Sequence, residues 1–232
     1  MNEYGVTINL LVGLFVGLLV GLGVNWLADR LPAYGRTDSP ALTVRNWQRW
    51  AGVLLVSILF GGYLFAFQEH PMVGSPAHHW VLWLLFALFL LILVVDLEHR
   101  RVLNVVVYPM ACVGLLLAFV RPEISLASAV IGALLGFASF FLLFLLRPGG
   151  LGAGDVKLAG LIGLLVGVPG VVVALITAIG LGGLGAAFLL VFRRVGLRGT
   201  MAYAPYLSLG AMVALLYGPT IIAWYLGRFG IL

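Results

Sequence analysis

The sequence predicts an all-α membrane protein with about eight transmembrane helices, and composition is the first observation behind that prediction. Hydrophobic residues make up 63 % of the 232 residues, charged residues make up 9 %, and the mean hydropathy is +1.17. A soluble domain of ordinary composition has about 25 % charged residues. The second observation is that the apolar residues form continuous runs joined by short connections, as membrane-crossing helices require. Because these runs use almost the whole chain, we expect residues 1–232 to form a single membrane domain.

The first four predicted helices cover residues 7–27, 51–67, 80–95 and 105–120. The first begins after Glu3 instead of a basic region and continues into more apolar sequence, so we expect a retained helix and not a cleaved secretory signal. The fourth contains Cys112, the only cysteine of the chain, which excludes an internal disulfide and a cysteine-based zinc site. We expect Cys112 to be a buried packing residue.

The last four predicted helices cover residues 124–146, 156–167, 170–192 and 206–227. Pro169 separates the sixth from the seventh, because proline interrupts a helix. The sixth has about 12 residues, which span about 18 Å and fall short of a hydrocarbon core of about 30 Å. Such a segment is tolerated where protein or a water-filled cavity surrounds it. We therefore expect water to reach the start of the sixth helix.

Lysine and arginine residues alternate between the two sides of the predicted helices. Of the 13 such residues, 11 fall on one side and 2 on the other. By the positive-inside rule the richer side is cytoplasmic, which places both termini outward and predicts a multi-pass protein of the inner (plasma) membrane. Basic loops beside anionic membrane lipid account for the formal charge of +5, so no nucleic-acid partner is needed.

Two aspartates at the ends of predicted helices are the candidate catalytic residues. Asp96 ends the third helix in Leu-Val-Val-Asp-Leu-Glu, and Asp155 begins the sixth in Gly-Ala-Gly-Asp-Val-Lys. A charge at the bilayer centre costs about 2.5 to 3.5 kcal/mol on insertion scales, so a carboxylate near lipid suggests a function. On the predicted topology both lie toward the cytoplasmic face. Asp155 could instead be a helix N-cap and Asp96 a residue at the water interface, but their joint occurrence favours an aspartyl protease.

Two carboxylates that share one proton can hydrolyse a peptide bond without a metal. The ionised partner takes a proton from the attacking water, and the protonated partner hydrogen-bonds the scissile carbonyl and helps the amine to leave. Asp155 follows the flexible Gly152-Ala153-Gly154 turn and opens a helix, whose dipole favours a negative charge. We therefore expect Asp155 to be the ionised partner and Asp96 to carry the proton. Lys157 lies off the helix face of Asp155, so no direct ion pair between them is implied.

The residues around both aspartates resemble the motifs of the type 4 prepilin peptidase family, membrane aspartyl proteases with a Gly-x-Gly-Asp motif. The resemblance spans most of the chain in four ordered blocks. The amino-terminal block matches at Gly21, Asn25, Arg30, Leu31 and Pro32, with Leu22 in place of serine. The first aspartate block matches at Asp96, Leu97, Glu98, Val102, Asn104, Pro109 and Gly114, with Leu103 in place of proline. The second matches at Gly152, Gly154, Asp155, Lys157 and Leu158, and the last at Pro205, Tyr206, Leu207 and Gly210.

The resemblance implies that Asp96 and Asp155 cleave the short basic leader from type IV pilin-like precursors, after a glycine and on the cytoplasmic side. The apolar helix of the precursor would lie in the bilayer lipid. Glycines spaced by four at Gly13, Gly17 and Gly21, and the glycine-rich run 180–185, could dock that helix or pack this protein's own helices.

Many family members carry an insert after the first helix in which two Cys-x-x-Cys pairs bind zinc, and they also methylate the new amino terminus with S-adenosylmethionine. Here the short connection of residues 28–50 contains no cysteine, which excludes that zinc site and argues against methyl transfer. Proteolysis needs no cofactor, and S-adenosylmethionine would be needed only if methyl transfer were retained. We interpret Arg36, Arg45 and Arg49 in this connection as positive-inside charges with lipid phosphate contacts.

The alternative functions are a proton-coupled transporter and a non-catalytic membrane subunit of a pilus or secretion machine. A transporter would place its carboxylates near the midplane between repeated halves, whereas both aspartates here lie toward one face. A non-catalytic subunit would leave the paired motifs unexplained.

Overall fold

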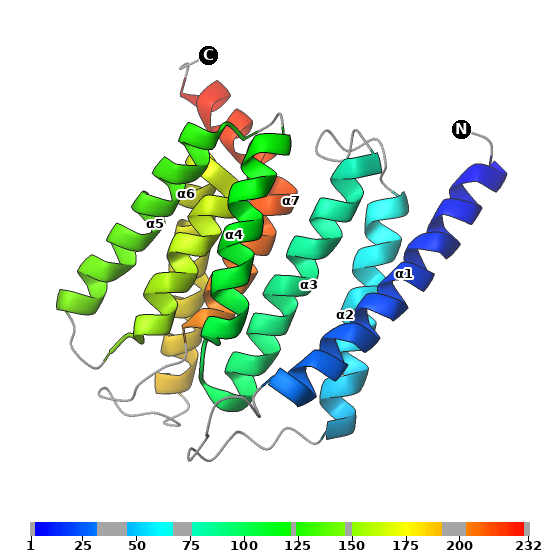
Figure 1. Ribbon diagram of the computed structural model, residues 1–232, viewed down its shortest axis with the longest axis horizontal. Coiled ribbons are helices and arrows are strands. Elements are labelled where there is room, and N and C mark those ends of the chain that lie inside the picture. The colour runs from blue at the N-terminus through cyan, green and yellow to red at the C-terminus, as the bar shows by residue number, and fades with distance from the viewer. Residues whose placement is uncertain are drawn as a thin grey trace. The chain divides into compact units, whose positions relative to one another are not determined.

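The computed structural model describes residues 3–31, 46–66, 76–121, 124–146, 150–191 and 203–229, and these residues form seven helices (Figure 1). The chain divides into two compact units, Met1–His99 and Arg100–Leu232. Most of the predicted connection 28–50 lies outside the described residues, with Pro32, Arg36 and Arg45 among them.

Unit 1 consists of α1 (Glu3–Arg30), α2 (Asn46–Ala66) and α3 (Pro76–His99). Glycine lets α1 approach α2 closely, because a Cβ on Gly17 would lie 2.8 Å from the Ile58 Cα. This glycine stripe therefore packs the protein's own helices, which was one of its two interpretations. Aromatic rings join α2 to α3: Phe60 stacks on Phe86 with ring centroids 3.6 Å apart, and Trp83 lies edge-on to Phe60 at 5.3 Å.

Unit 2 consists of α4 (Asn104–Val120), α5 (Leu126–Leu146), α6 (Ala153–Val191) and α7 (Ala204–Arg228). Because α6 packs on α4, α5 and α7, it is the central element of this unit. Gly132 of α5 and Gly163 of α6 face each other so closely that a Cβ on either would overlap the other's carbonyl group. Such contacts between small residues are typical of helices that associate in lipid.

The helix assigned as α6 reverses direction in the middle. Near its start, Asp155 accepts a hydrogen bond from the Ala204 N–H of α7, and in its second half Gly182 lies against Tyr203. Residues 155 and 182 would lie about 40 Å apart in a straight helix, yet they contact neighbouring residues of α7. α6 therefore folds back as two arms, residues 153–166 and 169–191 (Figure 1).

Gly167 permits this reversal, because its φ of 64° lies in the left-handed region that other residues rarely adopt. Side chains from α4 and α5 hold the turn. Ser128 Oγ donates to the Val168 carbonyl and accepts from the Val168 N–H, each at 2.9 Å. Arg121 Nη1 donates to the Leu165 carbonyl at 3.0 Å. The break between the sixth and seventh predicted segments therefore lies where the sequence placed it.

The eight predicted segments correspond to the seven helices of the described residues, because the sixth and seventh segments are the two arms of α6, separated by only two non-helical residues. The first arm is short, as expected, and its Leu158, Ile162 and Leu165 side chains are almost completely buried. Protein therefore surrounds much of this short segment, which is one of the two environments in which such a segment is tolerated.

Five of the described helices, α1, α3, α5, α6 and α7, are long and apolar enough to cross a membrane. The predicted spans 51–67 and 105–120 correspond to α2 and α4, which are not among the five. α4 has only 17 residues, and the first turn of α2 contains polar residues. By the length and composition of its helices, the chain is a polytopic helical membrane protein.

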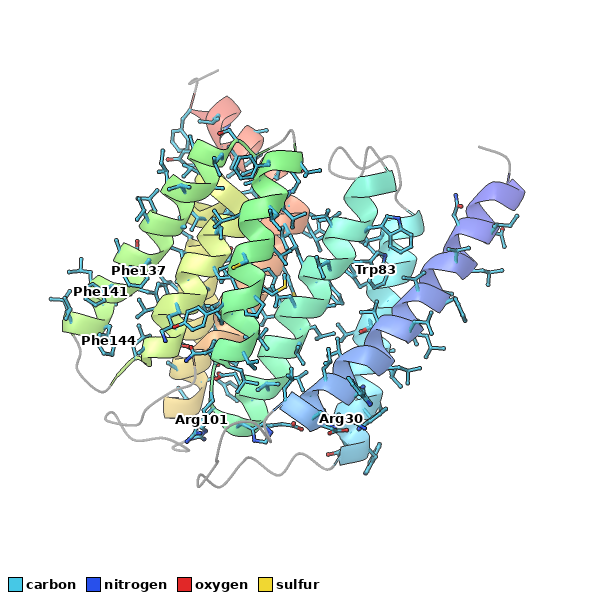
Figure 2. All side chains as sticks on the ribbon, viewed as in Figure 1. Arg30, Trp83, Arg101, Phe137, Phe141 and Phe144 are labelled. Carbon is cyan, nitrogen blue, oxygen red and sulfur yellow. The ribbon has the colours of Figure 1, made fainter. Side chains whose placement is uncertain are left out.

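α5 carries three aromatic rings on one side, of which Phe137 and Phe141 are exposed and Phe144 is partly exposed. Phe137, Phe141 and Phe144 follow one side of the helix (Figure 2), with successive ring centroids 5.6 and 6.5 Å apart. Exposed apolar rings of this kind fit a lipid environment. Cys112 of α4 is also exposed, so the prediction that it is buried was wrong. An apolar residue of a membrane helix can face lipid as readily as protein, which the sequence does not distinguish.

Candidate active site

Asp155, the first candidate catalytic residue, lies in the first turn of α6 and is 7 % exposed. Its Oδ2 accepts a hydrogen bond from the Gly152 N–H at 3.1 Å, and the Ala204 N–H at the start of α7 is a second backbone donor. Burial favours the neutral carboxyl group, whereas the two donors favour the ionised form. These opposing effects suit a group that must take up and release a proton.

Both glycines of the Gly-x-Gly-Asp turn have a steric role. A Cβ on Gly152 would lie 3.3 Å from Asp155 Oδ2 and would crowd the carboxylate. A Cβ on Gly154 would lie 2.9 Å from Val102 Cβ, in the connection that leads into α4. The turn is therefore closely packed on both sides, and this packing explains why glycine stands at each position.

The start of α7 also lies beside Asp155. Pro205 lies in the first turn of α7, where a helix leaves its N–H groups unpaired and proline is tolerated. Ala204 and Pro205 are both buried. Burial raises the pKa of the preceding residue, Tyr203, and the charges of Asp155 and Tyr206 raise it further. Tyr203 is therefore a neutral phenol near the Asp155 carboxyl group.

Lys157 binds α4. Its Nζ donates to Asn104 Oδ1 at 3.1 Å and lies 5.4 Å from the centre of the Tyr108 ring. Within the described part of the chain no ion pair joins Lys157 to Asp155. The contact joins two motif blocks, because Asn104 belongs to the first aspartate block and Lys157 to the second.

Asp96, the second candidate catalytic residue, lies in the last turns of α3 in unit 1 and is 3 % exposed. Glu98 follows two positions later and is also buried. Side chains two positions apart in a helix point about 200° apart, so these two carboxyl groups face different surroundings. The contacts of Glu98 therefore lie on a different side of α3 from the Asp96 side chain.

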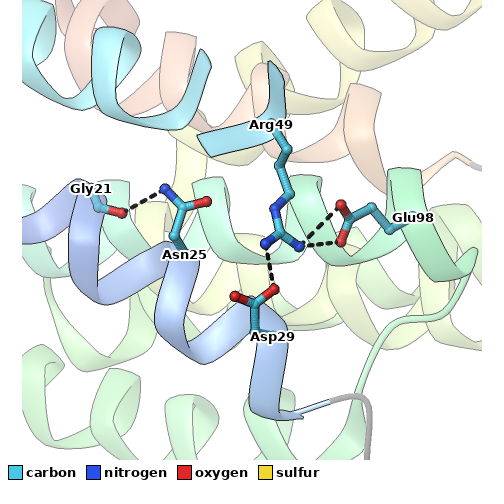
Figure 3. Close-up of polar contacts among 5 residues, drawn as sticks. All are labelled: Gly21, Asn25, Asp29, Arg49 and Glu98. Atoms are coloured by element: carbon cyan, nitrogen blue, oxygen red, sulfur yellow. Dashed lines mark hydrogen bonds and ion pairs between the residues drawn. The ribbon is translucent and has the colours of Figure 1, made fainter. Parts of the chain in front are cut away.

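Glu98 belongs to an ion cluster with Arg49 and Asp29 (Figure 3). Arg49 Nη1 donates to both carboxylate oxygens of Glu98, at 2.8 and 3.1 Å, while its Nη2 pairs with Asp29 near the end of α1. The Arg49 side chain is 7 % exposed. Lipid phosphate contacts were therefore the wrong interpretation for Arg49, because two carboxylates hold its guanidinium group within unit 1.

Asn25 is fully buried in α1. Its Nδ2 donates to the Gly21 carbonyl one turn earlier, at 3.1 Å (Figure 3). Asp29 lies one turn after Asn25 on the same helix face, so the amino-terminal motif block borders the ion cluster. The hydrogen bond of Asn25 is made within its own helix.

The structure sorts the predicted site residues into two groups. Unit 2 brings together Gly152, Gly154, Asp155, Lys157 and Pro205. Unit 1 contains Asn25, Asp96 and Glu98. Sequence reasoning named Arg49 and Val102 without predicting their contacts, and it missed Tyr203. Tyr203 had one local signal, its place two positions before Pro205, where the last motif block begins.

The fold and these carboxylates define the class of protein: a polytopic helical membrane protein with buried aspartates at the ends of two helices. Residues 83–187 match the type IV leader peptidase family. The chain belongs to this family, and the resemblance drawn from the four motif blocks is confirmed. Asp96 and Asp155 both lie within the matched segment.

Several curated relatives are named prepilin leader peptidase/N-methyltransferase. The Bacillus subtilis protein is 31 % identical over 107 residues, which cover 46 % of this chain and 43 % of that protein. The Aeromonas hydrophila protein is 30 % identical over 164 residues, or 68 % of this chain and 55 % of that protein. The Pseudomonas aeruginosa protein is 28 % identical over 189 residues, which cover 77 % of this chain and 62 % of that protein. This chain thus spans about half the length of these relatives, and no solved structure matches it.

Proposed function

We propose that this protein is a membrane-embedded aspartic endopeptidase that removes the basic leader peptide from type IV prepilin-like precursors, with Asp96 and Asp155 as its catalytic residues. One observation carries the proposal: both aspartates of the family-matched segment are buried at helix ends. Burying a carboxyl group opposes folding unless something compensates, and such groups cluster at functional sites. The names of the curated relatives support the same activity.

The covalent chain itself supports a dyad. A fully extended connection from Asp96 to Val102 spans about 22 Å at most. Val102 touches Gly154, the residue before Asp155. The short connection therefore limits how far Asp96 can lie from the start of α6.

The proposed mechanism uses two carboxyl groups that share one proton. Ionised Asp155 takes a proton from a water molecule, whose oxygen attacks the scissile carbonyl carbon. Protonated Asp96 donates to the carbonyl oxygen, and the amine then leaves with a proton as the C–N bond breaks. The Gly152 and Ala204 N–H groups hold the Asp155 carboxylate during these steps. No metal takes part in this scheme.

The proposed enzyme has eight membrane segments, with both termini outward and the active site toward the cytoplasm. The two arms of α6 count as two of these segments. The distribution of lysine and arginine supports this orientation, and the inner membrane is its proposed location. Methyl transfer, and with it the need for S-adenosylmethionine, is not part of the proposal, because the connection of residues 28–50 lacks the cysteines of the family insert.

The direct test is cleavage of a pilin-like precursor, with its leader intact, by the purified protein in lipid. Wild type is compared with Asp96→Asn and Asp155→Asn, and Asp38→Asn is a matched control outside the four motif blocks. We expect cleavage by wild type and the control and none by the two dyad variants. Removing an essential catalytic group costs several orders of magnitude in rate, so the readout is unambiguous.

Mass spectrometry of the products locates the cleaved bond, which we expect directly after a glycine. Full cleavage by either dyad variant would overturn the mechanism. Absence of cleavage by folded wild-type protein, with several pilin-like precursors, would count against the substrate class.

A further inference from the structure

Two tyrosines at the start of α7 fit against two glycines of the second arm of α6. A Cβ on Gly182 would lie 2.8 Å from the Tyr203 hydroxyl oxygen, 2.9 Å from its Cζ and 3.0 Å from its Cε2. One turn further along both helices, a Cβ on Gly185 would lie 2.8 Å from the Tyr206 Cζ. We call the surface of α6 at Gly182 and Gly185, where neither residue has a side chain, the glycine notch. Each tyrosine ring lies against the α6 backbone because no side chain stands in its way.

The Tyr203 ring in the glycine notch also contacts two other aromatic rings. Tyr203 packs between Phe140, with ring centroids 5.6 Å apart, and Tyr206, at 5.9 Å. A tyrosine has only two rotatable side-chain bonds, so a ring confined on several sides fixes its own backbone. A side chain at Gly182 that displaced this ring would therefore also act on the Tyr203 backbone.

The backbone of Tyr203 in turn sets the first turn of α7. Its carbonyl accepts from the N–H groups of Tyr206 and Leu207, each at 3.1 Å. The next N–H along the chain, that of Ala204, is the one that donates to the Asp155 carboxylate. One covalent step thus separates the residue held in the notch from the donor at the candidate catalytic group.

We infer that Gly182 and Tyr203 are positioning residues for the proposed peptidase: the fit of the Tyr203 ring against Gly182 places the Ala204 N–H on the Asp155 carboxylate. This inference rests on the proposed function. It extends the active site to the second arm of α6, which the Gly-x-Gly-Asp motif does not include. It also gives Gly182, within the glycine-rich run 180–185, a role in the active site.

The chain supplies matched controls within the same run. No described atom lies within 4 Å of a Cβ built on Gly180 or Gly183. Gly182→Ala and Gly183→Ala are therefore the same substitution, one position apart in one helix, and only the first meets the Tyr203 ring. A difference between the two variants reports the contact and not the helix propensity of alanine.

The first experiment measures kcat and KM for cleavage of a pilin-like precursor, together with thermal unfolding. A displacement of about 1 Å at a catalytic group can lower the rate by about 100-fold. We expect Gly182→Ala to lower kcat by at least tenfold with KM nearly unchanged, and Gly183→Ala to stay within about twofold of wild type. Tyr203→Phe should retain activity, because it keeps the ring, whereas Tyr203→Leu should lose it.

A double variant tests whether the two residues act as one unit. Adding Gly182→Ala to Tyr203→Leu should cause little further loss, because the ring that the new Cβ would displace is already gone. Folded Gly182→Ala protein with the kcat of Gly183→Ala would overturn the inference. If Gly182→Ala does not fold, full activity in Tyr203→Leu overturns it instead.

A second readout separates this inference from the proposed function. Amide hydrogen exchange of the peptide beginning at Tyr203 reports the order of the first turn of α7 without any substrate. We expect faster exchange in Gly182→Ala than in Gly183→Ala. If wild type cleaves no precursor, the proposed function fails, but the exchange measurement still tests whether Gly182 and Tyr203 position the start of α7. Equal exchange in both variants would refute this positioning role.

Discussion

Lys157 and Asn104 are hydrogen-bonded at 3.1 Å, and this contact ties the first turn of α6 to the first turn of α4. The same ammonium group lies 5.4 Å from the centre of the Tyr108 ring. Asp155 stands two positions before Lys157 in the same turn. The contact therefore fixes the start of the helix that carries a candidate catalytic residue, without placing a positive charge on that residue.

Lys157→Met should lower the free energy of unfolding by about 1 kcal/mol. Hydrogen bonds to charged groups contribute about 1.5 to 3 kcal/mol when protected from solvent, and this one is exposed. Methionine keeps the length of the side chain but neither donates a hydrogen bond nor carries a charge. Denaturation in mild detergent measures the change. In a double-mutant cycle with Asn104→Ala, the two losses should not add; full additivity would show that the contact contributes nothing.

Gly154→Ala should reduce precursor cleavage by more than tenfold. The added methyl group would lie 2.9 Å from Val102 Cβ, which is attached directly to the backbone and cannot rotate away. The α6 start, with Asp155 next to it, must then shift, and catalytic groups tolerate only small displacements. Cleavage kinetics measure the effect.

The matched rescue is the double variant Gly154→Ala, Val102→Gly. It removes the Cβ that the new methyl group meets, so cleavage should recover in part. A double variant no more active than Gly154→Ala would mean that the loss arises elsewhere than at this contact.

The positions of the helices could be predicted from the sequence, because apolar runs and the charged residues that border them indicate which segments avoid water. Asp96 and Asp155 could be found for the same reason, since a carboxylate at the end of an apolar run stands out. The break before Pro169 was visible because proline interrupts a helix.

The partners of these residues could not be read in the same way. Helices that are apolar on all sides carry no stripe that says which face meets which neighbour. Arg49 was therefore assigned to lipid although Glu98 and Asp29 hold it, and Cys112 was assigned to the core although it is exposed. Such pairings depend on contacts between distant parts of the chain, for which a single sequence has no local signal.

Arg49→Met should destabilise the protein more than Asp29→Asn. Removing Arg49 leaves the carboxylate of Glu98, 11 % exposed, without its partner, and breaking a buried ion pair costs about 3 kcal/mol or more. Asp29 is 46 % exposed, so water can replace Arg49 as its partner in part and the loss should be below about 1 kcal/mol. Thermal unfolding in detergent ranks the two variants. Equal losses would show that the Arg49 to Glu98 pair is no stronger than the exposed one.

Gly163→Ala and Gly183→Ala should change stability in opposite directions, although both replace a glycine of α6 by alanine. At Gly163 the new Cβ would overlap the Gly132 carbonyl group of α5, so the two backbones must separate, at a cost of about 3 kcal/mol. At Gly183 no described atom lies within 4 Å, and alanine in an open helical position is favoured over glycine by about 0.5 to 1 kcal/mol. Unfolding of both variants in the same detergent tests the difference. A stable Gly163→Ala variant would mean that α5 and α6 are not packed backbone to backbone at this point, and the close approach of α5 to the first arm of α6 would have to be abandoned.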